Sequence, residues 1–255
     1  ALDDRLAGQG FTVVVEPPFV VVGDEAPATV RHHATGILRW SIHLLEAEYF
    51  EARPGKLIEI WLFKNERSYR RGAKKFFDDT PDTPYGYYSP SHDALVMNIG
   101  PGAGTLVHEV VHPYVEANFP AAPAWFNEGL ASLYERPTER RGHIWGLPNW
   151  RLPSLKRQLA DKSLPPLTTL LGTSRDGFYN AAFDSYAYAR YLLLYLQSFR
   201  FREHLIREQN GTQDGKDLPH VSSGVVDASI LPIPPADEQT LLVERAGAWL
   251  SRVGA

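Results

Sequence analysis

The chain has almost no sulfur, because its 255 residues include no cysteine and a single methionine. The absence of cysteine excludes a disulfide scaffold, a thiol nucleophile, an iron–sulfur cluster and every zinc site built from thiolates. Any metal held by this chain must therefore have nitrogen and oxygen ligands. The nine histidines are the residues to inspect for such a site.

Long apolar runs and a strong charge of one sign are also missing. No stretch approaches the roughly 20 apolar residues that span a bilayer, so we expect no membrane span. The 26 basic and 30 acidic residues give a formal net charge of −4. This balance lacks the overall basic footprint of a nucleic-acid-binding protein, so we expect no nucleic-acid partner. A local basic cluster lies on the expected helix over 66–77 and is interpreted as a solvated helix face rather than a phosphate patch: Arg70, Arg71, Lys74 and Lys75.

Hydrophobic periodicity predicts strands mainly in the first half of the chain and helices mainly in the second. Strands are expected over 11–16, 19–23, 57–63, 85–89 and 94–99. Helices are expected over 27–50, 66–77, from Thr105 onward, 123–135, about 153–160, about 179–199 and near 237–253. The stretch 210–235 is polar, rich in glycine and proline, and poorly periodic.

The segment Thr105-Leu-Val-His-Glu-Val-Val-His-Pro113 has the spacing of a metal site. On a helix, His108 and His112 lie four residues apart on one face, so both imidazoles can reach one ion. Glu109 lies beside that face and is not directed straight at the ion. This placement suits a general base that acts on a water molecule at the metal.

A third ligand decides whether two histidines make a site. Fifteen residues separate His112 from Glu128, and they include the helix breaker Phe119-Pro-Ala-Ala-Pro123. The helix that follows can pack its apolar face onto the first and present the Glu128 carboxylate to the ion. Two histidines and one glutamate leave a fourth position open, as in a catalytic zinc site. Polar residues close enough in sequence to orient the ligands are Asn127, Ser132 and Glu135.

HEVVH followed by WFNEGLASLYE resembles the gluzincin branch of the zinc metallopeptidases, within the peptidase MA-like superfamily. In that group HExxH precedes a helix with a W-x-N-E-G-x-A pattern. The resemblance implies that His108, His112 and Glu128 bind Zn²⁺ and that Glu109 is the catalytic base. The likeness to the M1 aminopeptidases is more distant, because the gap of 15 residues is shorter than expected for them.

Similar enzymes use a tyrosine on a later helix to stabilise the oxyanion, within a pattern like Y-x-x-G/A-x-x-x-x-x-L. Aligning Ala189 and Leu196 with this pattern selects Tyr186. Tyr188 is the alternative. Helical spacing with other apolar residues favours a core position for Tyr188, and an ordinary buried aromatic remains an alternative role for Tyr186.

The expected strand over 94–99 precedes the metal helix directly. In similar folds an edge strand at this place pairs with an extended peptide substrate, the β-augmentation mode. A purely structural edge strand is the alternative. Val96-Met-Asn98 has no glutamate that could grip a substrate amino terminus. The interpretation therefore favours an endopeptidase.

These inferences combine into one hypothesis. We expect an α+β, zincin-like fold in which a small mixed sheet, with its edge strand packed on the HExxH helix, precedes a mainly helical half. The whole chain 1–255 would be one catalytic domain, with an α/β subdomain over 1–121 and a mainly helical subdomain over 122–255.

The function of this domain would be zinc-dependent hydrolysis of peptide or protein substrates. The alternative is an inactive zinc-binding homologue that serves as a peptide-binding or scaffold module. The missing cysteine also suits an exported enzyme, periplasmic or extracellular, whose leader was removed before Ala1.

Overall fold

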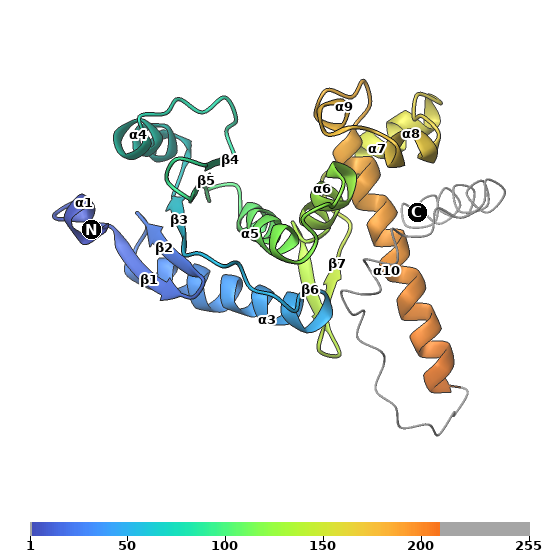
Figure 1. Ribbon diagram of the computed structural model, residues 1–255, viewed down its shortest axis with the longest axis horizontal. Helices are drawn as coiled ribbons and strands as arrows, with labels where there is room; N and C mark the ends of the chain where they lie inside the picture. The colour runs from blue at the N-terminus through green and yellow to red at the C-terminus, as the bar shows by residue number, and fades with distance from the viewer. Residues whose placement is uncertain (1, 210–255) are drawn as a thin grey trace. The chain divides into compact units, whose positions relative to one another are not determined.

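A computed structural model describes residues 2–209 and has a mixed α+β fold, as the sequence predicts. Figure 1 shows the order of its helices and strands. The chain divides into two compact units, Ala1–Ala117 and Asn118–Ala255. Within the described residues, no helix combines the length and the apolar composition that a bilayer crossing requires. The helix expected near 237–253 lies outside the described residues.

The first unit contains a five-stranded mixed sheet with the strand order β1-β2-β3-β5-β4. β2, β3 and β5 run parallel, while β1 and β4 pair antiparallel with their neighbours. The strands are β1 (Thr12–Glu16), β2 (Phe19–Gly23), β3 (Ile58–Phe63), β4 (Gly86–Ser89) and β5 (Ala94–Asn98). Each predicted strand is confirmed within one residue at either end.

The prediction that 94–99 forms an edge strand is wrong. β5 pairs with β3 on one side and with β4 on the other, and all of its residues are buried. The reason is visible in its composition, because a strand that is apolar on both faces is typical of a sheet interior. The hairpin places β4 at the edge instead. A substrate cannot pair along residues 94–99, since their main-chain groups already bond to two strands.

The helices of the first unit lie before, between and after these strands. They are α1 (Leu2–Leu6), α2 (Pro27–Arg31), the π-helical segment η1 (His32–Leu38), α3 (Arg39–Glu48), α4 (Glu66–Phe77) and α5 (Gly104–Asn118). The predicted helix over 27–50 is thus present as three consecutive segments. α4 begins where Asn65 caps it, because the Ser68 amide donates to Asn65 Oδ1 at 2.9 Å.

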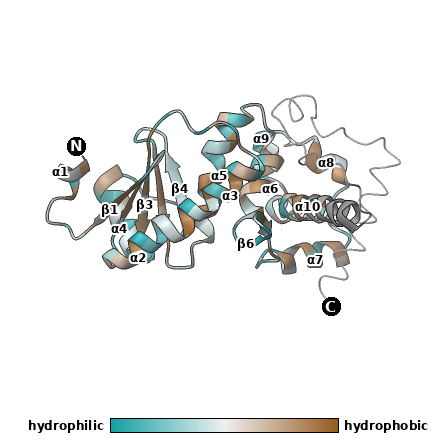
Figure 2. Ribbon diagram, turned by 90° about the horizontal axis from the view of Figure 1, so that it is seen from below, coloured by the Kyte–Doolittle hydropathy of each residue, from teal (hydrophilic) through white to brown (hydrophobic). Residues whose placement is uncertain are grey.

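Side chains alternate between the two faces of the sheet, and one face forms an aromatic core with α1 and α4. Trp61 of β3 lies 5.2 Å from Phe77 of α4 between ring centroids. Figure 2 shows the central strands coloured as hydrophobic. The buried members of this cluster are Leu6, Val22, Trp61, Phe63, Tyr69, Phe77, Ala94 and Val96.

Helix α5 is held in the first unit through Tyr114, which is fully buried. Its ring lies 5.2 Å from Phe50 and 6.3 Å from Phe19, and its hydroxyl donates to Glu46 Oε1 at 2.7 Å. Burial, with a smaller contribution from Glu46, raises the pKa of this phenol well above its ordinary value. These contacts hold the helix that carries the two histidines.

The second unit is mainly helical within the described residues and contains one short hairpin. Its elements are α6 (Ala124–Leu133), β6 (Pro137–Arg140), β7 (His143–Gly146), α7 (Leu152–Ala160), α8 (Leu167–Leu171), α9 (Arg175–Tyr179) and α10 (Ser185–Gln209). The predicted helices over 123–135 and about 153–160 are confirmed. The helix expected over about 179–199 begins later, at Ser185. The hairpin was not predicted, and its turn places Arg141 and Gly142 at positive φ.

Candidate metal centre

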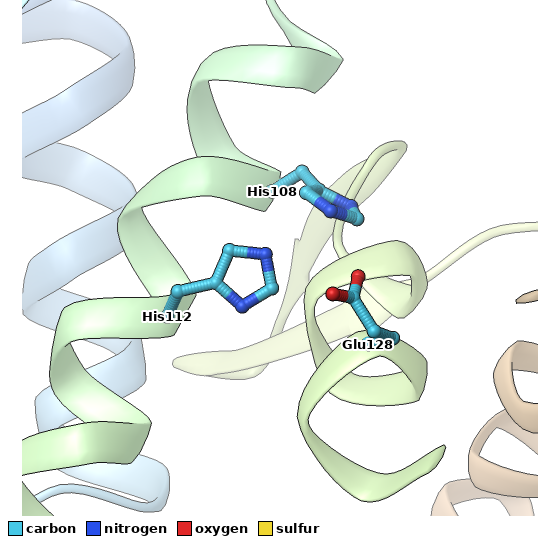
Figure 3. A group of neighbouring side chains, drawn as sticks. All are labelled: His108, His112 and Glu128. Carbon is cyan, nitrogen blue, oxygen red and sulfur yellow. The ribbon is translucent and has the colours of Figure 1, made fainter. Parts of the chain in front are cut away.

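Three of the predicted site residues come together in the structure. His108, His112 and Glu128 each offer one ligand atom, and these atoms all lie within 4.8 Å of one another. Figure 3 shows the two imidazoles of α5 and the carboxylate of α6 directed toward one another. A group of two imidazoles and one carboxylate at this spacing can bind a metal ion.

The histidine pair owes its geometry to the helical period. The ring centroids of His108 and His112 lie 5.0 Å apart, with an interplanar angle of 78°. Both side chains are half-buried. The buried residues of α5 are apolar or aromatic: Leu106, Val107, Val110, Val111, Tyr114 and Val115. The spacing of four residues places both half-buried imidazoles on one side of the helix.

Glu128 is a buried carboxylate, with only 6% of its surface exposed. Helix α6, which carries Glu128, approaches α10 closely at Gly129. A Cβ placed on Gly129 would lie 3.2 Å from the Cβ of Ala189 and 3.1 Å from Leu193 Cδ1. Glycine at this position therefore permits the tight contact of α6 with α10, and this packing accounts for the glycine of the W-x-N-E-G-x-A pattern.

The C-terminal end of α6 is held by Arg190, whose side chain is completely buried. Its Nε donates to the Ser132 carbonyl at 2.8 Å, and its Nη2 donates to the carbonyl of Leu147. Burial lowers the pKa of this guanidinium to about 10. The Ser132 carbonyl also accepts from the Glu135 amide at 3.3 Å, so Arg190 adds a buried side-chain donor at this helix end.

Tyr179 was missed by the sequence analysis. Its hydroxyl donates to Glu128 Oε1 at 2.6 Å, although the two residues are 51 positions apart in sequence. A hydrogen bond to one carboxylate oxygen orients the group and so supports a metal ligand. No sequence signal could have found this contact, because Tyr179 ends the five-residue helix α9, whose packing depends on the whole unit.

Glu109 lies half-buried on α5, between the two histidines in sequence. Its negative charge reaches a second tyrosine of the first unit, Tyr69, which is fully buried. Burial is the main cause that raises the pKa of Tyr69, and Tyr87, Asp79 and Glu109 raise it further. The structure thus places the predicted base near a phenol that stays protonated.

The two candidate tyrosines of α10 have different surroundings. The Tyr188 hydroxyl donates to the Pro165 carbonyl at 3.3 Å, and burial raises the pKa of this residue to about 12. The Tyr186 ring lies 6.3 Å from the ring of Tyr179, the residue that bonds to Glu128. Its other neighbours include Phe178, 5.2 Å away, and the Arg151 guanidinium, 5.0 Å away.

Two polar residues considered as orienting groups have other environments. Glu135 forms an ion pair with Arg151 at 2.6 Å and accepts a hydrogen bond from Asn149 at 2.7 Å. The Ser132 hydroxyl is buried and makes no hydrogen bond to any described residue. Tyr179, by contrast, donates a hydrogen bond directly to the carboxylate of Glu128.

Comparison with known protein families and with curated proteins found no match to this chain. The donor group itself is therefore the feature that indicates a function. Two half-buried imidazoles and a buried carboxylate can hold a cation, and an acidic side chain adjoins them on the same helix.

Proposed function

We propose that the protein is a zinc-dependent peptidase of gluzincin type that cleaves internal peptide bonds. The observation that carries this proposal is the meeting of the HExxH histidines with Glu128, whose ligand atoms lie within 4.8 Å of those of His108 and His112. The adjacent Glu109 supplies an acid–base group on the same helix. Together these residues match the roles that the gluzincin resemblance implies.

The donor set suits zinc. Tetrahedral zinc at roughly 2.0–2.1 Å from its ligands holds them about 3.3 Å apart, so small side-chain rotations bring the three donors into range. Three protein ligands would leave one position for substrate or water. When bound, zinc would polarise the scissile carbonyl and lower the pKa of a water molecule.

The chain's own residues would perform the remaining tasks. The Glu109 carboxylate would accept a proton from the attacking water and then donate it to the leaving amine nitrogen. The Tyr186 hydroxyl would donate a hydrogen bond to the developing oxyanion. Tyr179 would hold the Glu128 carboxylate in place through the bond to its Oε1.

The first experiment measures zinc by elemental analysis of protein purified without chelator. We expect about one zinc per chain, and a loss of that zinc in His112→Ala. The exposed His32 lies outside the metal group and provides the matched control, since His32→Ala should keep its zinc. A native protein that neither carries zinc nor takes it up would contradict the proposal.

The second experiment separates an active peptidase from an inactive binding module. Glu109→Gln should retain zinc but lose hydrolysis by a factor of about 10²–10⁴. Glu116→Gln is the control, because Glu116 is an exposed glutamate of the same helix. A peptide library with free and blocked termini tests the endopeptidase assignment, since only an endopeptidase cleaves peptides blocked at both ends. Hydrolysis that is equal in native protein and Glu109→Gln would rule out this base.

Tyr186→Phe tests the oxyanion donor. Loss of the hydroxyl should lower kcat more than it raises KM, because the oxyanion exists only in the transition state. Tyr188→Phe is the comparison, since the Tyr188 hydroxyl donates to the Pro165 carbonyl. If only Tyr188→Phe lowers kcat, the assignment moves to Tyr188.

A further inference from the structure

The first unit contains a cavity of about 530 Å³ whose lining includes none of the three metal-group residues. This volume lies within the range of small-molecule sites, roughly 300–1,000 Å³. Its walls come from the loop before β1, from the segments that follow β2 and β3, and from one side of α4. The polar residues of its lining include Gln9, Asp24, Lys64, Arg71 and Lys75.

The cavity lies at the carboxyl ends of two adjacent parallel strands. Asp24 follows directly after β2, and Lys64 follows directly after β3. In sheets with parallel strands, this end is where ligands commonly bind. The Lys64 amide donates to Asp24 Oδ1 at 2.7 Å, so the two strand ends are joined at the cavity wall.

The charge of the cavity is opposite to that of the whole chain. Three cations, Lys64, Arg71 and Lys75, and one carboxylate, Asp24, line it, which gives a formal charge of 3 − 1 = +2. The chain as a whole has a net charge of −4. A basic cavity in an acidic protein favours an anionic ligand.

The basic cluster of α4 divides into two pairs of residues. Arg70 pairs with Glu66 at 2.9 Å and Lys74 pairs with Asp78 at 2.6 Å, so these two cations are neutralised on the helix surface. Arg71 and Lys75 instead line the cavity. The Lys75 ammonium donates to Gln9 Oε1 at 2.5 Å. Neither Arg71 nor Lys64 makes a side-chain hydrogen bond or an ion pair with any described residue, so their charges remain available to a ligand.

Aromatic side chains supply the apolar part of the wall. Phe11 and Phe76 both line the cavity and are only partly buried, with ring centroids 5.5 Å apart. The preceding Gly10 has a φ of +73° and no atom within 4 Å of where a Cβ would stand, so the loop adds no side chain there. The cavity therefore has both a cationic and an aromatic part.

We propose that this cavity binds a small phosphate monoester with an aromatic or apolar body. The Arg71 guanidinium and the Lys64 ammonium would bind the dianionic phosphate, because a planar guanidinium matches phosphate oxygens in a bidentate fashion. Phe11 and Phe76 would contact the body of the ligand. Our interpretation of the α4 cluster as a purely solvated face would then hold for Arg70 and Lys74 and be wrong for Arg71 and Lys75.

Calorimetric titration of the full chain with adenosine 5′-monophosphate tests this proposal, with inorganic phosphate and adenosine as the other two arms. We expect the nucleotide to bind, inorganic phosphate to bind more weakly, and adenosine not to bind at millimolar concentration. The His112→Ala variant should bind the nucleotide equally, which excludes the metal group as the binding place. No binding by native protein, or adenosine binding as tightly as the nucleotide, would overturn the site. Phosphate binding as tightly as the nucleotide would overturn the role of Phe11 and Phe76.

Two substitutions that remove charges of opposite sign from the cavity lining, with one control, make the test specific to this cavity. Arg71→Gln should weaken nucleotide binding about tenfold, because a hydrogen bond to a charged group is lost. Arg67→Gln removes the same charge from an exposed position of α4 that does not line the cavity, and should change nothing. Asp24→Asn keeps an acceptor for the Lys64 amide but removes a negative charge, so it should tighten binding severalfold. Unchanged affinity in Arg71→Gln, or weaker binding in Asp24→Asn, would contradict the proposal.

Discussion

The two units hold α5 and α6, the helices of the candidate metal group, by different physical means. In the first unit the sheet packs an apolar, aromatic core against α1 and α4, and α5 buries apolar residues and the ring of Tyr114. In the second unit α6 packs on α10 at Gly129, and its end is held by buried hydrogen bonds from Arg190. Apolar packing dominates one unit, while the other depends also on buried polar groups.

This difference determines how each unit responds to substitution. Apolar cores tolerate volume-conserving changes but lose stability when a cavity forms. Buried polar networks tolerate little, because removing one partner leaves the other desolvated and unpaired. Large-to-small substitutions should therefore affect the first unit most, and loss of single polar groups should affect the second.

Trp61→Ala should have the largest effect of the substitutions considered. Trp61 is fully buried at the centre of the aromatic core, and removing such a side chain costs about 3–5 kcal/mol. Urea unfolding followed by circular dichroism measures the change. The control is Val15→Ala, whose side chain is 62% exposed and whose loss should stay within about 0.5 kcal/mol. A loss below 1 kcal/mol in Trp61→Ala would contradict the view that this core dominates the first unit.

Arg190→Ala should lower the free energy of unfolding by about 2–4 kcal/mol, because the carbonyls of Ser132, Leu133 and Leu147 lose the guanidinium donor and a cavity forms. Arg190→Lys keeps a cation but cannot reproduce the forked geometry that reaches Ser132 and Leu147, so it should recover only part of the loss. Hydrogen exchange of α6 amides locates the effect. Full recovery in Arg190→Lys would show that charge rather than geometry matters here.

Tyr179→Phe should weaken zinc binding by about tenfold, because the Glu128 carboxylate loses the hydrogen bond that orients it. Competition with a chromophoric chelator measures the affinity. Tyr85→Phe removes a hydroxyl from a tyrosine of the first unit that is 51% exposed, and should leave zinc binding unchanged. Equal affinities in all three proteins would mean that α6 positions Glu128 without help from Tyr179.

The smallest effects are expected at two matched helix caps, one in each unit. Asn65 accepts a hydrogen bond from Ser68 at 2.9 Å, and Ser174 accepts one from Gly177 at 3.1 Å. Asn65→Ala should cost about 1 kcal/mol and Ser174→Ala about 0.5 kcal/mol, because α9 is shorter and its loss unfolds less structure. Thermal unfolding of both variants checks the order. The reverse order would mean that α9 contributes more to its unit than its five residues suggest.

Local patterns in the sequence were enough to predict most of the first unit. The strand over 58–63 and the helix over 66–77 depend on residues that are neighbours in the chain, so periodicity locates them. The geometry of the His108–His112 pair could also be predicted from local sequence, because the two residues lie four positions apart on one helix.

Features that depend on distant partners were harder to predict. The apolar composition of β5 favours an interior position, but no residue within 94–99 specifies β3 and β4 as its partners. The hairpin over 137–146 has only one glycine in its turn and little alternation, so the pattern did not predict it. The contact between Tyr179 and Glu128 spans 51 residues and has no local signal.

The outer strand β1 has a consequence for handling the protein. In the described part of the chain it pairs only with β2, and Val13 and Val15 are exposed on it. An open edge of β-branched residues can template a strand from another molecule, which is how sheet proteins begin to aggregate. Natural edges often carry lysine for this reason. Val15→Lys is accordingly the first substitution to make if the concentrated protein precipitates.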